Sequence, residues 1–150
     1  MLTAAVLIPI VAGLIALGGL PYFALVALSA LAAEVEFIGL LSERRFRLVH
    51  LSGVALVGLC LADSWFEGRG LLIPGMGLIL IASLAWQVLR YPRSLISEWT
   101  AAVSSGLYIG ICASHLFRLR AIPEGLWWTL VAVPVTLAAD ASAYVIGSLW

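Results

Sequence analysis

One acidic side chain, Asp140, stands in an otherwise uncharged apolar run near the end of the sequence. An acid costs about 2.5–3.5 kcal/mol on membrane-insertion scales, so its presence in such a run marks a candidate functional residue. Asp140, Ala143, Tyr144 and Gly147 follow the i, i+3, i+4, i+7 spacing of one helical face. Ala139, Ala143 and Gly147 add a ladder of small residues that lets a second helix approach closely. We therefore expect this face to pack against another part of the protein.

Two roles for Asp140 stay open from the residues alone. It is either a structural carboxylate bonded to a neighbouring helix, for example through Ser104 or Ser105, or a ligand for a metal or a substrate phosphate. Mg²⁺ takes oxygen ligands, typically one or two carboxylates together with substrate phosphates and water. The second role therefore needs further oxygen ligands near Asp140.

The composition is that of a protein embedded in lipid. Of the 150 residues, 63% are hydrophobic and 11% are charged, and the mean hydropathy is +1.13. A soluble domain usually carries about 25% charged residues. We expect an all-α, polytopic integral membrane protein with residues 1–150 in one transmembrane domain. The basic residues are eight scattered arginines, which excludes nucleic-acid binding through a basic patch.

About six transmembrane helices are predicted from the apolar segments. Gly18-Gly19-Leu20-Pro21 divides the apolar segment that begins with the uncharged residues 1–33 into two helices, because glycine and proline interrupt helices. The predicted spans are about 2–18, 22–41, 48–62, 71–89, 100–117 and 126–147. Most approach the length of roughly 20 residues that crosses a bilayer.

The arginines predict the orientation of these spans. Residues 42–47 and 90–93 carry five of the eight arginines and are separated by two spans, so they share one side. Cytoplasmic loops are enriched in arginine and lysine, which places this side and the N-terminus in the cytoplasm of a cell membrane. Tryptophans favour both interfaces, here Trp65, Trp127 and Trp128 outside and Trp86, Trp99 and Trp150 inside. Asp140 then lies in the cytoplasmic half of the last span.

The remaining polar residues give few chemical motifs. Glu34 and Glu36 are two residues apart and point to different sides of a helix, so at most one faces the bundle interior. His50 and His115 lie near opposite ends of their spans and cannot share a metal or complete a Ser-His-Asp set with Asp140. Neither a phosphate-binding P-loop nor a lysine occurs in the sequence.

The segment from Asp140 to Gly147 resembles the D-[ST]-x-A-Y-x-x-G segment of the phosphatidate cytidylyltransferases, also called CDP-diacylglycerol synthases. Residues 2–10 resemble the first span of that family, and Glu36-Phe-Ile-Gly-Leu40 resembles the E-[FWY]-x-x-L at the end of its second. Gly106-Leu-Tyr108, Arg120 and Gly125 resemble the approach to the aspartate-bearing helix.

The resemblance implies a Mg²⁺-dependent nucleotidyl transfer on the cytosolic side of the membrane. CTP and phosphatidic acid are the implied substrates, and CDP-diacylglycerol and pyrophosphate are the products. Asp140 would be the catalytic residue and the metal ligand, with Ser142 and Tyr144 in substrate binding. Glu36 would be a further polar residue of the bundle. A homodimer, or association with the C-terminal half of the same family, is the expected assembly.

The sequence also departs from the family pattern. Leu137 stands where the family has tryptophan, and Ser148 stands where it has arginine. The family is about twice as long, and its H-G-G-x-x-D-R-x-D element is absent here, so we expect an N-terminal portion that is inactive alone. Two alternatives stay open, namely a non-enzymatic helix-packing partner and another lipid-processing enzyme of polyprenol kinase-like type.

Overall fold

The described part of the chain forms six helices, in agreement with the about six that the sequence predicts. The computed structural model describes residues 2–41, 50–66, 69–90 and 96–149. The helices are α1 (Leu2–Leu17), α2 (Gly19–Leu41), α3 (Leu51–Trp65), α4 (Leu72–Leu89), α5 (Ile96–Ala121) and α6 (Gly125–Leu149). The break between α1 and α2 falls at Gly18, inside the predicted Gly-Gly-Leu-Pro interruption.

Four of the helices are long and apolar enough to cross a membrane, namely α2, α4, α5 and α6. The other two, α1 and α3, have 16 and 15 residues. A helix of 15 residues is about 22 Å long, shorter than the hydrocarbon core of about 30 Å. The all-α membrane class is confirmed, and by length alone four of the six helices qualify as spans.

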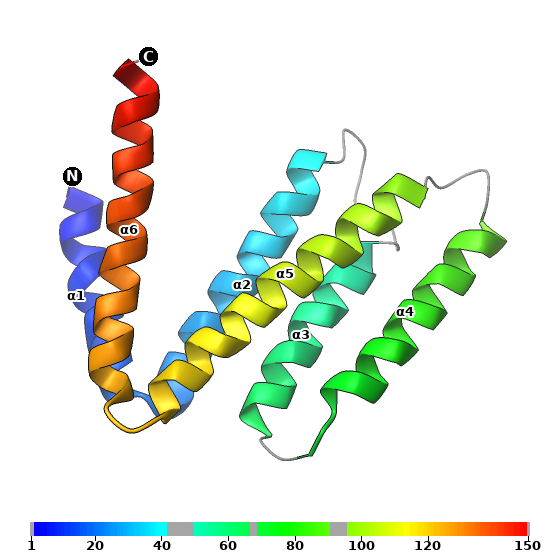
Figure 1. Cartoon of the computed structure of the whole chain (residues 1–150), viewed down its shortest axis with the longest axis horizontal. Helices are drawn as coiled ribbons and strands as arrows, with labels where there is room; N and C mark the ends of the chain where they lie inside the picture. The colour runs from blue at the N-terminus through cyan, green and yellow to red at the C-terminus, as the bar shows by residue number, and fades with distance from the viewer. Residues whose placement is uncertain (1, 42–49, 67–68, 91–95, 150) are drawn as a thin grey trace.

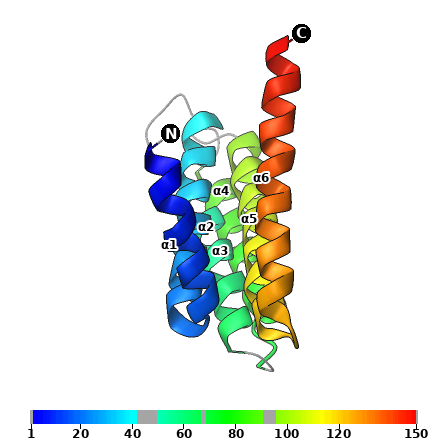
Figure 2. The same cartoon turned by 90° about the vertical axis from the view of Figure 1, so that its left-hand side faces the viewer.

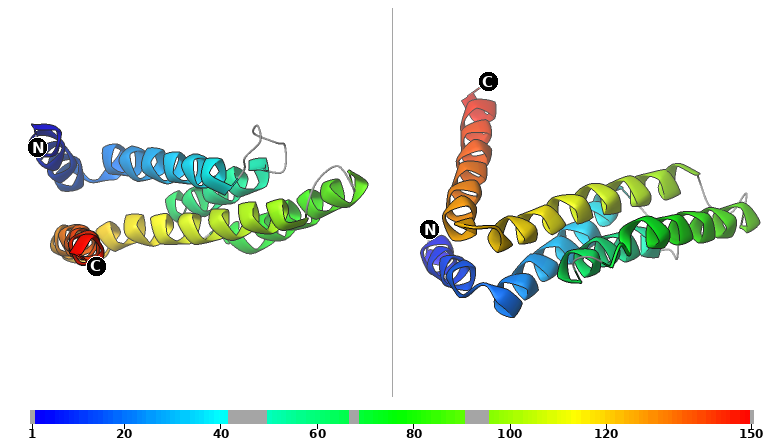
Figure 3. Two further views of the ribbon diagram at one scale, coloured as in Figure 1. Left: turned by 90° about the horizontal axis from the view of Figure 1, so that it is seen from above. Right: turned by 60° about the horizontal axis from the view of Figure 1, so that its bottom comes forward.

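The helices divide into two groups, which we call the bundle (α2–α5) and the arm (α1 and α6) (Figure 1). Within the bundle, α3 packs against α2, α4 and α5, and α2 also packs against α5. The arm diverges from the bundle above a shared base, and both chain termini lie at its far end (Figures 1 and 2). Seen from above, α1 and α6 stand to one side of the bundle (Figure 3).

Glycines allow the bundle helices α3 and α5 to come into backbone contact. A Cβ atom on Gly106 would lie 2.5 Å from the carbonyl oxygen of Gly53. One turn further along α5, a Cβ atom on Gly110 would lie 3.0 Å from the sulfur of Cys60. Small residues four apart permit such close packing between membrane helices.

The arm joins the bundle through two short connections at the base. Gly18 and Gly19 have φ angles of 65° and 53° at the α1–α2 joint, and Glu124 has a φ angle of 60° at the α5–α6 joint. These left-handed conformations suit glycine and turn the chain sharply. Arg120 also spans the joint, because its Nε donates to the carbonyl oxygen of Ile15 at 2.9 Å.

Aromatic side chains fill the base between the two connections. The rings of Phe23 and Trp65 lie 4.7 Å apart between centroids, and those of Phe23 and Phe117 lie 5.1 Å apart. Tyr22 is 1% exposed, and its hydroxyl donates to the carbonyl oxygen of Leu116 at 3.1 Å. Ile15 of α1 belongs to the same buried cluster as Tyr22, and Leu126 of α6 packs against that cluster, so arm and bundle share a core at the base.

Successive helices run in opposite directions, so their ends alternate between two levels (Figure 1). Trp65, Trp127 and Trp128 belong to helix ends at the base, whereas Trp86 and Trp99 belong to helix ends at the opposite level. This agrees with the two predicted aromatic belts. The arginines of 42–47, Arg93 and Trp150 lie outside the described residues.

Candidate functional site

Asp140 lies on α6, fifteen residues after Gly125 and thus about 22 Å from the base. Its side chain is exposed. Tyr144, one turn further, is 78% exposed, and a Cβ atom on Gly147 would meet nothing within 4 Å. The expectation that this face packs against another part of the chain is wrong for the described residues.

The reason is the difference in length between the two arm helices. α6 has 25 residues and α1 has 16, so α6 is longer by about 13 Å. Figure 2 shows α6 continuing beyond the end of its neighbour. Tyr144 and Gly147 therefore lie on a part of α6 beyond the end of α1, whereas Asp140 lies near the level where α1 ends.

Ser142 does not lie on the same face as Asp140. Residues two apart are separated by about 200° around a helix and do not face each other. The Ser142 hydroxyl donates to the carbonyl oxygen of Ala138 on its own helix at 2.6 Å. The structure brings Asp140 and Tyr144 onto one face and places Ser142 away from them.

The interior acid of the bundle is Glu34, and the prediction of Glu36 for that place is wrong. Glu36 is exposed, whereas Glu34 is 0% exposed. As expected from their spacing, only one of the two acids faces inward. The register of α2 against α3 and α5 decides which one, and this register cannot be read from the spacing of the two acids.

Glu34 is held where α2, α3 and α5 meet. Its Oε1 accepts a hydrogen bond from the Ser105 hydroxyl at 2.9 Å, and a Cβ atom on Gly53 would overlap both this oxygen and the carbonyl oxygen of Ala102. Its Oε2 is buried and has no hydrogen-bond partner among the described residues. Ser105, which the sequence offered as a partner for Asp140, instead bonds Glu34.

A sequence signal for this junction exists in the spacing of Gly106 and Gly110. Two glycines four apart in an apolar helix are typical of a close helix contact. The sequence reasoning applied this rule only to Ala139, Ala143 and Gly147. The glycine pair on α5 would have predicted a close helix contact next to Ser105.

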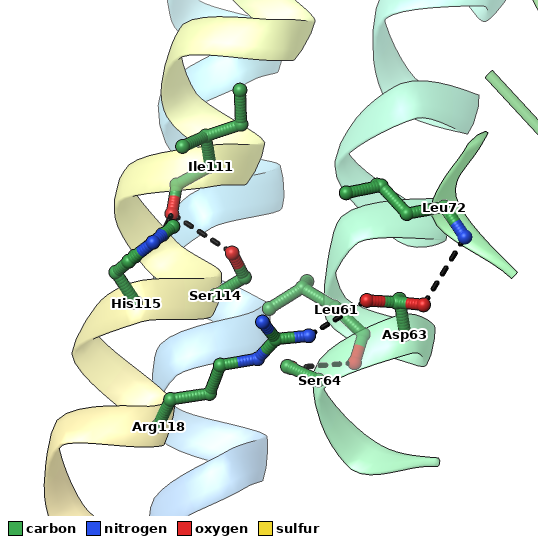
Figure 4. Close-up of polar contacts among 8 residues, drawn as sticks. All are labelled: Leu61, Asp63, Ser64, Leu72, Ile111, Ser114, His115 and Arg118. Atoms are coloured by element: carbon green, nitrogen blue, oxygen red, sulfur yellow. Dashed lines mark hydrogen bonds and ion pairs between the residues drawn. The ribbon is translucent and has the colours of Figure 1, made fainter. Parts of the chain in front are cut away.

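A second polar centre lies near the base, where Asp63 and Arg118 form an ion pair (Figure 4). The Arg118 Nη2 donates to Asp63 Oδ2 at 2.6 Å. Asp63 Oδ1 accepts from the backbone N–H of Leu72, the first residue of α4, at 3.1 Å. This carboxylate therefore links α3, α4 and α5.

The two histidines belong to different parts of the bundle. His50 is buried beside the start of α3, whereas the Nδ1 of His115 lies 2.8 Å from the carbonyl oxygen of Ile111 within α5 (Figure 4). Among the residues that the structure describes, no three His, Cys, Asp or Glu side chains gather in a way that could hold a metal ion.

An apolar groove of about 460 Å³ runs between the arm and the bundle. Tyr22, Ile15 and Leu116 line it toward the base, and Ser29 and Tyr108 line it toward the other end. The arm contributes residues from both of its helices, with Val133 from α6. A second groove of about 270 Å³ between α1 and α6 shares Val133 and extends to Leu137.

Asp140 continues the face of α6 that lines both grooves. It follows Val133 by seven residues, which returns to the same side of the helix about 10 Å further along the axis. Tyr144 follows on the same side. This face of α6 is therefore apolar along the grooves and ends in the carboxylate of Asp140 and the phenol of Tyr144.

Comparison with known proteins identifies a family for this chain. The model of the family described as the cytidylyltransferase family matches residues 1–150. No match was found among curated proteins or among solved structures. The family match covers every residue of the chain, including all six helices and Asp140. The chain therefore belongs to the cytidylyltransferase family.

Proposed function

We propose that this protein takes part in the CTP-dependent conversion of phosphatidic acid to CDP-diacylglycerol in a cell membrane, with its N-terminus in the cytoplasm. The observation that carries the proposal is the family match over residues 1–150. The membrane-spanning helices support a lipid as the second substrate, because an apolar helical protein meets lipids from the side.

Asp140 is the residue we assign to the reacting phosphates. It is exposed on α6 and continues the face that lines the groove. Tyr144, one turn away and 78% exposed, would donate its hydroxyl hydrogen to a phosphate oxygen. Ser142 contributes less in this proposal, because its hydroxyl already donates to Ala138.

The implied Mg²⁺ fits this site only as an ion held largely by substrate. Asp140 is the one carboxylate on α6, and the described residues hold no cluster of three ligands. Mg²⁺ commonly takes one or two carboxylates and completes its shell with phosphates and water. When bound, the ion would neutralise the phosphate charge that the transfer brings together. Asp140 would orient it, and the remaining protein ligands would come from the C-terminal half that the resemblance implies.

A reconstitution experiment tests the proposal. The protein is placed in liposomes with phosphatidic acid, CTP and Mg²⁺, either alone or together with the C-terminal half of a family enzyme. We expect CDP-diacylglycerol and pyrophosphate only in the second case. Absence of product in every combination, with both parts inserted in the membrane, would contradict the proposal.

Substitution of Asp140 tests the site itself. Asp140→Asn keeps the size of the side chain and removes its charge, so we expect product formation to fall to background while insertion is unchanged. Thr136→Val is the matched control, because Thr136 lies one turn earlier on α6 and its hydroxyl bonds only Ala132 of its own helix. Near-normal turnover by Asp140→Asn would reduce this acid to a structural role.

The non-enzymatic alternative is favoured by one observation, the uncovered outer part of α6. Leu137, Val145 and Ile146 are each more than half exposed there. A partner helix would cover this surface without any reaction. Recovery of a stable complex that forms equally well with Asp140→Asn and never yields product would favour that alternative.

A further inference from the structure

The groove between the arm and the bundle has the form of a site for one hydrocarbon chain. On α5 its lining runs from Tyr108 to Leu116, eight residues or about 12 Å. One leaflet of a bilayer is about 15 Å deep in hydrocarbon. The groove therefore matches a lipid acyl chain in length.

The volume and lining of the groove suit a single acyl chain. The groove holds about 460 Å³, within the range of about 300–1,000 Å³ that small-molecule sites occupy. Its lining is mostly apolar, so a hydrocarbon chain is the kind of ligand that it favours.

The two ends of the groove differ in chemistry. At the base the hydroxyl of Tyr22 donates to the carbonyl oxygen of Leu116. The polar groups at this end are therefore already bonded to each other, and the rest of the lining there is apolar. At the other end stand the hydroxyl side chains of Ser29 and Tyr108. Beyond them, Asp140 continues the groove-lining face of α6. A lipid would thus lie with its acyl chain toward the base and its headgroup toward Asp140.

We propose that the groove between α1, α2, α5 and α6 binds one acyl chain of phosphatidic acid and so directs the lipid phosphate toward Asp140. The identity of the lipid rests on the proposed function, whereas the position of the chain rests on the groove. The arm then acts as one wall of a lipid site and the bundle as the other.

Photocrosslinking in liposomes tests this placement with Mg²⁺ and without CTP, because the ion would offset the repulsion between the lipid phosphate and the Asp140 carboxylate. The probe is phosphatidic acid with a diazirine in the middle of one acyl chain, at low abundance in phosphatidylcholine vesicles. We expect labelled peptides from α2 and α5 around Ser29 and Cys112, and loss of this labelling on addition of unlabelled phosphatidic acid. Labelling spread evenly over all exposed helix faces would overturn the proposal, as would equal competition by added phosphatidylcholine.

Groove-filling variants sharpen the test. Cys112 and Ser29 are exposed residues of the lining on facing helices, so Cys112→Phe and Ser29→Phe fill the groove without disturbing the core. Ala82→Phe is the control, because Ala82 is an exposed residue of a separate apolar groove of about 360 Å³ between α3 and α4. We expect both groove variants to lose the labelling and the control to keep it.

The results separate this proposal from the proposed function. Specific labelling with no CDP-diacylglycerol formation under any condition would leave the lipid site standing and remove the reaction. Normal product formation by Cys112→Phe and Ser29→Phe would support the proposed reaction and contradict the binding of an acyl chain in the groove. Unchanged labelling in both variants would also overturn the groove assignment.

Discussion

The bundle and the arm each carry a ladder of small residues, and within the described part of the chain only the ladder of the bundle packs against another helix. On α5, Gly106 and Gly110 bring the helix into contact with α3. On α6, the ladder of Ala139, Ala143 and Gly147 is exposed. Four-residue spacing therefore permits close packing without determining whether the partner belongs to the same chain.

The acids of the two regions differ in the same way. Glu34 in the bundle is 0% exposed and accepts a hydrogen bond from Ser105, whereas Asp140 in the arm is exposed. A buried acid whose partner lies on a neighbouring helix stabilises that contact. An exposed acid on a membrane helix keeps its oxygens for a ligand, which makes the arm the more promising place for chemistry.

The largest difference in stability between the two ladders is expected when the same methyl group is added to each. Gly106→Ala places a Cβ 2.5 Å from the carbonyl oxygen of Gly53, and overpacking of this kind costs about 1–3 kcal/mol. Gly147→Ala meets nothing within 4 Å and should be neutral or stabilising by less than about 1 kcal/mol, because alanine favours a helix. Thermal denaturation in detergent micelles measures both. Equal melting temperatures for the two variants would contradict the contrast.

Removal of the buried acid should have a smaller effect. Glu34→Ala deletes the hydrogen bond from Ser105, and such interhelical bonds in membranes contribute about 0.6 kcal/mol, up to about 1.7. Glu34→Gln keeps an oxygen acceptor and should retain most of the stability. The difference in unfolding free energy between these two variants is the measurement. A fully stable Glu34→Ala protein would mean that the glycine contact alone holds the junction.

The ion pair near the base should contribute less again. In Asp63→Asn the side chain keeps an oxygen for the N–H of Leu72 but loses its charge opposite Arg118. The Arg118 side chain is 39% exposed, so solvent screening limits the loss to below about 1 kcal/mol. A double-mutant cycle with Arg118→Gln isolates the pair. A coupling free energy of zero would show that the hydrogen bond to Leu72 is the useful contact.

The smallest effect on global stability is expected at the joint between the regions. Arg120→Ala removes the donors to the carbonyl oxygens of Ile15 and Ala16, so the end of α1 loses its cap while the bundle is untouched. Electron–electron distance measurements between labels at the exposed positions Leu28 and Val145 should show a broader distribution. Arg118→Ala is the control, because Arg118 contacts Asp63 inside the bundle. Identical distributions in both variants would mean that Arg120 does not hold the arm.

The helices were predictable because each is a long apolar segment bounded by glycine, proline or charge. The α1–α2 break follows directly from Gly18 and Gly19, whose positive φ angles interrupt the helix. The division into bundle and arm was not predictable. It depends on which helix faces meet, and the apolar residues of these segments surround each helix too evenly to select one face.

The candidate site was predictable only in part. The isolated acid at Asp140 stands out from its surroundings in the sequence, and its role in catalysis and metal binding stays a prediction. The sequence suggested Glu36 as the polar residue of the bundle, whereas the structure has Glu34 there. The two positions differ by about 200° around α2, and their spacing alone does not show which one faces inward. Ser142 was grouped with Asp140 by nearness in sequence, although the helical period places it on another side.

The residues with positive φ angles at the base form the turns about which α6 can pivot. The chain passes between arm and bundle at Gly18–Gly19 and at the turn that contains Glu124, and Asp140 lies about 22 Å from this base. A rotation of the arm by about 10° would therefore move the carboxylate by about 4 Å, more than the length of a hydrogen bond. Small angular changes at the base are thus amplified into the making or breaking of contacts at the acid.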